Sequence, residues 1–356
     1  MNTKPSTFSQ RLAAARKMAG LSLQELSDKI DNYVTRQALQ RYENDVMSPG
    51  YDVLKRLADA LGVQIDYFYI EQNIVFEGID YRKRSSQLTK TEAASIEEKI
   101  KDKLFRIFSL ELELNIQNPA QYFDYTKEIG TEDDAEEAAQ ILREEWNLGY
   151  DPIPDVVKML EDKGFYLVDI EAPQSFDGLK TISNGKKIIA LRKADSGSDI
   201  VRRRFTALHE LAHHSLQFAP SLTEKEYEKL CHTFACAVLY PKLKAETELS
   251  KNRFHFYGNE LILIKRRWGI SFSAVFSRAY RLGIITSAVY KRLNIGYRKR
   301  GFHINEPGEY CADELPNRFE MLVYHALASK AISITEAANY MNMPVDKFKE
   351  ELKALM

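Results

Sequence analysis

Phe205-Thr-Ala-Leu-His209-Glu210-Leu-Ala-His213-His214 contains the pattern HExxH, in which two histidines stand four residues apart and a glutamate directly follows the first. On a helix, residues four apart lie on one face, so His209 and His213 can hold one ion, and zinc is its natural occupant. Glu210 lies about 100° further round the helix, beside a water that the ion would activate, so its carboxylate can take the proton of that water. The stretch therefore indicates a metallohydrolase.

The sequence on either side of this pattern predicts two helices. The first is amphipathic, because its apolar residues recur at spacings of three and four: Val201, Phe205, Leu208, Ala212 and Leu216. The second opens with a T-x-x-E capping box at Thr223 and Glu226, and its apolar stripe begins at Tyr227 and stops at Pro241. We expect a third metal ligand from this second helix, where Glu228 stands beside the stripe.

The second helix also gives a specific resemblance to a known family. Together with HExxH, the segment Glu228-Lys-Leu-Cys-His232-Thr-Phe-Ala-Cys-Ala-Val-Leu-Tyr-Pro241 is similar to the ImmA/IrrE metallopeptidases, whose second motif runs E-x-x-A-[ND]-x-F-A-x-x-L-L-x-P. Matched residue by residue, the third zinc ligand of the family falls on Glu228. The resemblance implies Zn²⁺ held by His209, His213 and Glu228, with Glu210 as the catalytic base of a peptidase.

Two positions depart from the family pattern. Cys231 and His232 replace the usual Ala and Asn or Asp, and His232 lies one turn past Glu228. His232 therefore stays open as a competing ligand or as a neighbour of the ligands, and His214 is a further candidate ligand. The oxyanion partner is not assigned, with Tyr240 and His232 as candidates.

The elements before the metal helix predict an α+β domain, and the resemblance implies that its fold is zincin-like. A helix begins near residue 135, a second helix covers 156–163, a strand covers 165–170, and a hairpin follows with its turn at Ser183-Asn184-Gly185. The order helix, helix, small sheet, metal helix is that of the ImmA/IrrE family. Motifs between about residues 135 and 290 support the resemblance.

Residues 8–70 predict a bundle of short helices. Ser22 and Glu25 form a capping box that opens the second helix, and a third helix runs from Thr35 to Glu43. This part resembles the helix-turn-helix of the Cro and phage-repressor (XRE) family. One departure is the turn between Ile30 and Thr35, which has four residues where the family usually has two.

The resemblance implies that the third helix reads an operator in double-stranded DNA. Arg and Gln side chains form bidentate contacts with base edges, and a residue at a helix start can meet a phosphate. The predicted DNA-binding residues are Gln24, Thr35, Arg36, Gln37, Gln40, Arg41 and Asn44. The alternative is a degenerate three-helix bundle used for dimerisation.

Length and composition indicate a globular protein of two or three domains, with 356 residues of which 44% are hydrophobic and 28% charged. The chain has no run of eighteen apolar residues and no N-terminal signal, so we expect a cytoplasmic protein without a membrane partner. Its cysteines, Cys231, Cys236 and Cys311, are too few and too ill-spaced for a disulfide framework, and we expect packed thiols.

The formal net charge of -1 conceals a division along the chain. Residues 124–145 are strongly acidic, whereas residues 261–305 hold ten Lys or Arg and no Asp or Glu. The basic side chains gather in clusters at 265–267, 291–292 and 298–300. Three interpretations stay open: a solvated helical face, a surface for DNA phosphates, and a partner of the acidic segment.

These patterns divide the chain into four segments: a helix-turn-helix domain over 1–70, a helical connector over 71–130, an ImmA/IrrE-like metallopeptidase domain over 131–250 and a helical C-terminal region over 251–356. We expect a mainly α fold with a small antiparallel β-sheet (α+β). We expect the connector either to space the helix-turn-helix and metallopeptidase domains or to pair two chains in a homodimer. Residues 332–343 fit a second, poorer helix-turn-helix or simple helical packing, and we favour the packing.

The functional prediction is a DNA-binding transcriptional regulator with a zinc-dependent endopeptidase that cuts a regulatory protein, such as a repressor or a toxin–antitoxin partner. Two other classes stay open. One is a non-proteolytic DNA-binding regulator whose zinc domain senses a signal, and the other is an antitoxin-like protein that holds a toxic partner. The intact Glu210 favours the enzyme, because a structural zinc site has no use for that carboxylate.

Overall fold

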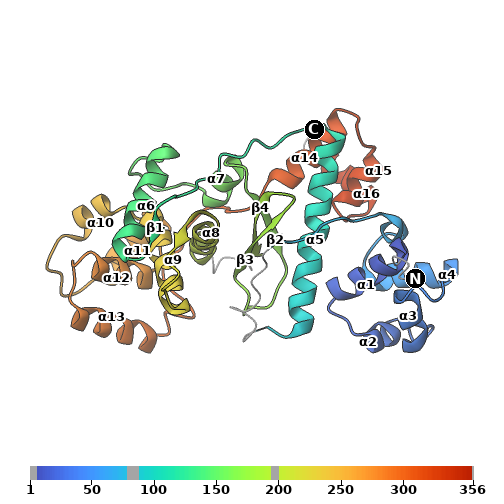
Figure 1. Cartoon of the computed structure of the whole chain (residues 1–356), viewed down its shortest axis with the longest axis horizontal. Helices are drawn as coiled ribbons and strands as arrows, with labels where there is room; N and C mark the ends of the chain where they lie inside the picture. The colour runs from blue at the N-terminus through green and yellow to red at the C-terminus, as the bar shows by residue number, and fades with distance from the viewer. Residues whose placement is uncertain (1–5, 78–87, 194–199, 355–356) are drawn as a thin grey trace. The chain divides into compact units, whose positions relative to one another are not determined.

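The computed structural model describes residues 6–77, 88–193 and 200–354, and it divides into two compact units (Figure 1). Unit 1 comprises Met1–Asn118, Ile170–Phe176 and Asn317–Met356, and unit 2 comprises Pro119–Asp169 and Asp177–Pro316. The chain is mainly helical with a few strands in small sheets, so the predicted α+β class is confirmed. Within the described ranges, no helix is long and apolar enough to cross a membrane.

Short helices build the N-terminal part of unit 1: α1 (Thr7–Met18), α2 (Leu23–Lys29), α3 (Arg36–Glu43), α4 (Tyr51–Leu61) and the 3-10 helix η1 (Ile65–Tyr69). Side-chain caps fix the starts of α1, α2 and α3, since Ser6, Ser22 and Thr35 each accept a hydrogen bond from a backbone N–H three residues on. The predicted capping box of Ser22 and Glu25 is present. The apolar faces meet in a core that includes Leu12, Leu26, Leu39, Leu57 and Phe68.

A long helix, α5 (Lys90–Glu113), packs against α1 and against α14 within unit 1. The Ser95 hydroxyl donates to the Met18 carbonyl at 2.9 Å, and the Arg318 guanidinium pairs with Glu111 at 2.6 Å. The C-terminal helices are α14 (Arg318–Ala328), α15 (Ile334–Tyr340) and α16 (Val345–Ala354). Elements from both ends of the chain therefore pack on α5.

Unit 2 contains a three-stranded sheet of strand order β2-β4-β3, built from β2 (Tyr166–Ile170), β3 (Gly178–Ser183) and β4 (Lys186–Arg192). β3 and β4 form the predicted antiparallel hairpin, and Ser183 pairs with Lys186. The turn is therefore Asn184 and Gly185 alone, whose φ angles of 52° and 71° suit a two-residue hairpin loop. A short parallel pair, β1 (Glu128–Ile129) with β5 (Gln217–Phe218), was not predicted.

Helices make up the rest of unit 2: α6 (Glu132–Glu145), α7 (Val156–Asp162), α8 (Ile200–Ser215), α9 (Glu224–Leu239), α10 (Lys242–Leu249), α11 (Gly258–Trp268), α12 (Phe272–Arg281) and α13 (Ser287–Lys299). The predicted capping box of Thr223 and Glu226 opens α9. α8 contacts α9 and also the β3–β4 hairpin, and α6 packs on α9. The HExxH helix therefore lies at the centre of this core.

The cysteines divide into two groups. Cys231 and Cys236 of α9 are buried, as predicted, and burial raises the pKa of the Cys236 thiol to about 11. Cys311 is exposed. The prediction of a packed thiol is wrong at that position, because Cys311 lies in the irregular segment between α13 and α14.

Candidate metal centre and DNA interface

α8 and α9 bring the three predicted metal ligands together. His209 and His213 lie one turn apart on α8, with their Nε2 atoms 3.0 Å from each other. Glu228 of α9 approaches both rings: its Oε2 lies 3.1 Å from His209 Nε2, and its Oε1 lies 3.7 Å from His213 Nε2. Ligand atoms of the three residues all lie within 4.8 Å of one another.

This donor set fits zinc. Two imidazole nitrogens and one carboxylate oxygen are the ligands of a common class of catalytic zinc site, which keeps a fourth position open. Ligand atoms that lie about 2.0–2.1 Å from a tetrahedral ion are roughly 3.3 Å from one another. The measured separations of 3.0, 3.1 and 3.7 Å lie on both sides of that value. The three side chains are therefore arranged to hold one small ion.

Tyr227 orients one of the two imidazoles. Its hydroxyl lies 2.6 Å from His213 Nδ1, and the Cys231 Sγ lies 3.5 Å from the same nitrogen. Contacts of this kind at one ring nitrogen fix the ring and direct the other nitrogen to a metal. In the part of the chain that the structure describes, the buried Nδ1 of His209 has no such partner, although the Phe205 ring stacks on the His209 ring at 6.3 Å.

The hairpin holds the C-terminal end of α8. Lys180 of β3 donates to the His213 carbonyl at 3.0 Å, and Lys187 of β4 donates to the His214 carbonyl at 3.1 Å. The last carbonyls of a helix lack partners within it and carry the negative end of its dipole, so two ammonium groups stabilise this end. The small sheet thus positions the metal-binding helix.

The two other candidate ligands lie outside the three-residue group. His214 turns toward β4, where its Nε2 lies 2.9 Å from the Ile188 carbonyl. Burial lowers the pKa of His214 to about 3, so its ring is neutral and Nε2 carries the proton that this carbonyl accepts. His232 is exposed, and its ring centroid lies 4.8 Å from that of His209. The geometry favours Glu228 as the third ligand.

Glu210, the predicted base, is 2% exposed on α8. Tyr240 does not fit the role of oxyanion partner, because it is fully buried and its hydroxyl lies 3.0 Å from a Glu248 carboxylate oxygen. Tyr227 was missed at the sequence level, where it counted only as part of the apolar stripe of α9. No spacing rule separates a tyrosine that packs from one that also contacts a ligand.

The unusual turn of the helix-turn-helix is a defined structure. Asp31 and Asn32 adopt left-handed φ angles of 54° and 56°, which these residue types tolerate better than most. The buried Ser27 hydroxyl donates to the Val34 carbonyl at 2.6 Å and so closes the turn. The two extra residues therefore extend the turn without opening the core.

The predicted DNA-binding residues all lie on the surface of α2, α3 and their caps: Gln24, Thr35, Arg36, Gln37, Gln40, Arg41 and Asn44. Arg16 of α1 holds α3 in place, because its guanidinium binds both carboxylate oxygens of Glu43 at 2.6 and 2.7 Å. The Thr35 hydroxyl caps α3 by accepting a hydrogen bond from the Ala38 N–H at 3.3 Å. The side chains expected to read bases are thus free of the core.

The comparison with known proteins agrees with this geometry. Residues 12–68 match the helix-turn-helix family, a range that contains α2, α3, α4 and most of α1 and η1. No curated protein matches the chain. This part of the chain is an XRE-type helix-turn-helix, and the protein is a DNA-binding transcriptional regulator.

We predict that alanine at Arg36, Gln37, Gln40 or Arg41 weakens binding to the operator by about 1–3 kcal/mol each, because each change removes a base contact. The measurement is a pair of titrations of the full chain, one with a duplex selected from random DNA and one with a mixed-sequence duplex. Lys55→Ala, an exposed cation on α4, is the matched control. Equal losses on both duplexes would mean phosphate contacts only.

Proposed function

We propose that this DNA-binding regulator is also a zinc-dependent endopeptidase that cleaves a regulatory protein. The observation that carries the proposal is the convergence of His209, His213 and Glu228, from two helices, to within 4.8 Å of one another. The resemblance of the same two helices to the ImmA/IrrE motifs supports it. We propose a regulatory protein as the substrate because the same chain carries a DNA-binding domain.

Zinc in this site supplies a Lewis acid for the scissile carbonyl and the attacking water. The chain's own residues transfer the proton and orient the ligands. The Glu210 carboxylate takes a proton from the attacking water and then delivers it to the leaving amine nitrogen. Tyr227 keeps the His213 ring turned toward Glu228. Burial of Glu210 at 2% exposure limits its contact with bulk water.

The proposed ligand set predicts which substitutions change the zinc content of the purified full chain. We expect about one zinc per chain in the native protein, and a clear loss in His209→Ala, His213→Ala and Glu228→Ala. His214→Ala and His232→Ala are matched controls, since each removes a neighbouring imidazole that lies outside the group, and both should retain zinc. Normal zinc in Glu228→Ala with loss in His232→Ala would contradict the assignment of the third ligand.

A further inference from the structure

The ten cations of residues 261–305 separate into two groups in the structure. Four of them form ion pairs within unit 2, namely Lys265 with Glu306, Arg267 with Glu248, Arg278 with Glu136 and Arg281 with Glu132. The other six have no ion pair among the described residues, and all six are exposed: Arg266, Lys291, Arg292, Arg298, Lys299 and Arg300. Five of these six belong to α13 or its C-cap.

The unpaired cations of α13 lie on one face. Counting 100° per residue, the exposed positions 287, 288, 291, 292, 295, 298 and 299 fall within a sector of about 140°. Lys291, Arg292, Arg298 and Lys299 occupy four of the seven positions, and no acidic residue interrupts them. The opposite face packs into the core through Val289, Leu293 and Tyr297. A charged surface of one sign differs from ordinary helical surfaces, which mix both signs.

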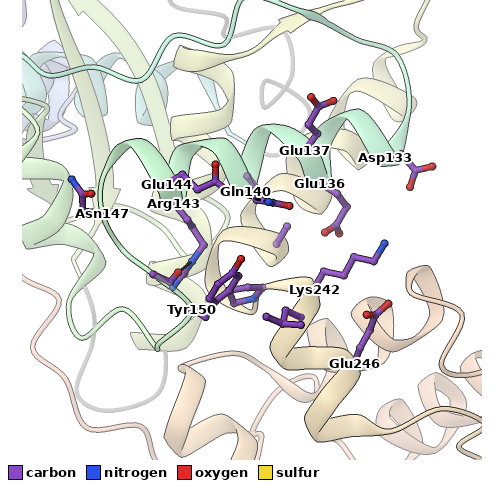
Figure 2. A pocket seen from close by; sticks show the side chains of 15 residues that line it. Asp133, Glu136, Glu137, Gln140, Arg143, Glu144, Asn147, Tyr150, Lys242 and Glu246 are labelled. Atoms are coloured by element: carbon purple, nitrogen blue, oxygen red, sulfur yellow. Dashed lines mark hydrogen bonds between the residues drawn. The ribbon is translucent and has the colours of Figure 1, made fainter.

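The acidic segment of the chain is already engaged elsewhere. Glu132 of α6 pairs with Lys229 and Arg281, and Glu136 binds the buried guanidinium of Arg278. Three other acidic side chains of α6, Asp133, Glu137 and Glu144, border a cavity of about 920 Å³ between α6 and α10 (Figure 2). The cations that line this cavity are Arg143 and Lys242, and none comes from α13. α6 is therefore not the partner of the α13 cations.

We propose that the exposed face of α13 binds the phosphate backbone of double-stranded DNA, as a contact independent of base sequence and separate from α3. Duplex DNA carries one negative charge per about 1.7 Å of its axis, so a row of cations two turns long meets several phosphates. An anionic membrane fits less well, because a membrane-surface helix presents an apolar stripe and the apolar stripe of α13 is in the core. The face has one exposed large apolar side chain, Ile295.

The test uses the full chain with Lys291→Gln, Arg298→Gln and Lys299→Gln combined. Binding to a labelled duplex of mixed sequence is titrated over a range of KCl concentrations. We expect affinity to fall at least about tenfold at low salt, and the salt dependence to become shallower by up to about three units of slope, because each lost phosphate contact removes about 0.9 unit. The same loss should appear in a protein whose α3 already carries Arg36→Ala and Arg41→Ala.

Two matched variants control for charge and for folding. Lys158→Gln, Lys225→Gln and Lys242→Gln remove the same charge from exposed positions outside α13 and should leave the slope unchanged. Lys291→Arg, Arg298→Lys and Lys299→Arg keep the charge and should bind as the native chain does. The melting temperature of the glutamine variant should equal that of the native chain at low and high salt.

Three results would overturn the proposal. An unchanged slope of the salt dependence in the glutamine variant would show that α13 makes no contact with DNA. A salt-dependent fall in its melting temperature, with DNA binding unchanged, would mean that the cations serve a partner within the chain. Loss of binding to phosphatidylcholine–phosphatidylserine vesicles or to single-stranded RNA, with duplex binding intact, would assign the face to those polyanions.

Discussion

Glu210→Gln is expected to lower the rate of peptide cleavage by a factor on the order of 10²–10⁴ while about one zinc per chain remains bound. Glutamine keeps the size of the side chain and cannot accept the proton of the attacking water. The proposed zinc ligands are His209, His213 and Glu228, and Glu210 is not among them. The measurement combines the zinc content of the purified chain with the cleavage rate of a protein substrate.

Glu228→Ala is the informative comparison, because it should lose zinc and cleavage together. Glu224→Gln makes the same change as Glu210→Gln at an exposed position of α9 and should keep both. A cleavage rate in Glu210→Gln equal to that of the native chain would show that Glu210 takes no part in the reaction. Loss of zinc from Glu210→Gln would instead place its carboxylate among the ligands.

Glu314→Ala is expected to destabilise unit 2 by about 3–5 kcal/mol, since it leaves a buried cation unpaired. The Glu314 side chain has no exposed surface and pairs with the equally buried Arg204 of α8. Its other oxygen accepts hydrogen bonds from the Val156 and Val157 N–H groups, both at 2.9 Å, at the start of α7. One carboxylate thus pairs with a buried guanidinium and accepts hydrogen bonds from a helix N-terminus.

The free energy of unfolding, measured by denaturant titration of the full chain, tests this prediction. Glu309→Ala, an exposed glutamate of the same irregular segment, should cost less than about 0.5 kcal/mol. Replacing both Arg204 and Glu314 with leucine should cost less than the sum of the two single changes, because no uncompensated charge remains. A loss below about 1 kcal/mol in Glu314→Ala would show that the pair contributes little.

Local signals explain why much of the fold was predictable. Capping boxes are read directly from residues three apart, and those at Ser22 and at Thr223 open α2 and α9 where predicted. The HExxH spacing fixes two side chains on one helical face before any packing is known. Glu228 was placed by the family motif, and the structure brings it to 3.1 Å from His209.

Contacts between residues far apart in the sequence could not be predicted from it. Glu314 reaches Arg204 across 110 positions, and no local pattern indicates that pair. The same holds for Arg278, which looked like one cation in a basic stretch and is a buried partner of Glu136. Pairing between residues far apart in the sequence depends on how the helices pack. The composition of a stretch gives only its net charge and does not say which cations have partners. The division of the basic stretch into paired and unpaired cations therefore required the structure.

The most direct test of the proposed peptidase compares the proteomes of cells that carry the native chain or its Glu210→Gln form. We expect at least one regulatory protein to be cut in the first cells and intact in the second, with new termini that appear only with the native chain. Identical sets of termini in both cells, with zinc bound to both forms, would contradict the peptidase and leave a DNA-binding regulator whose metal site does no cleavage.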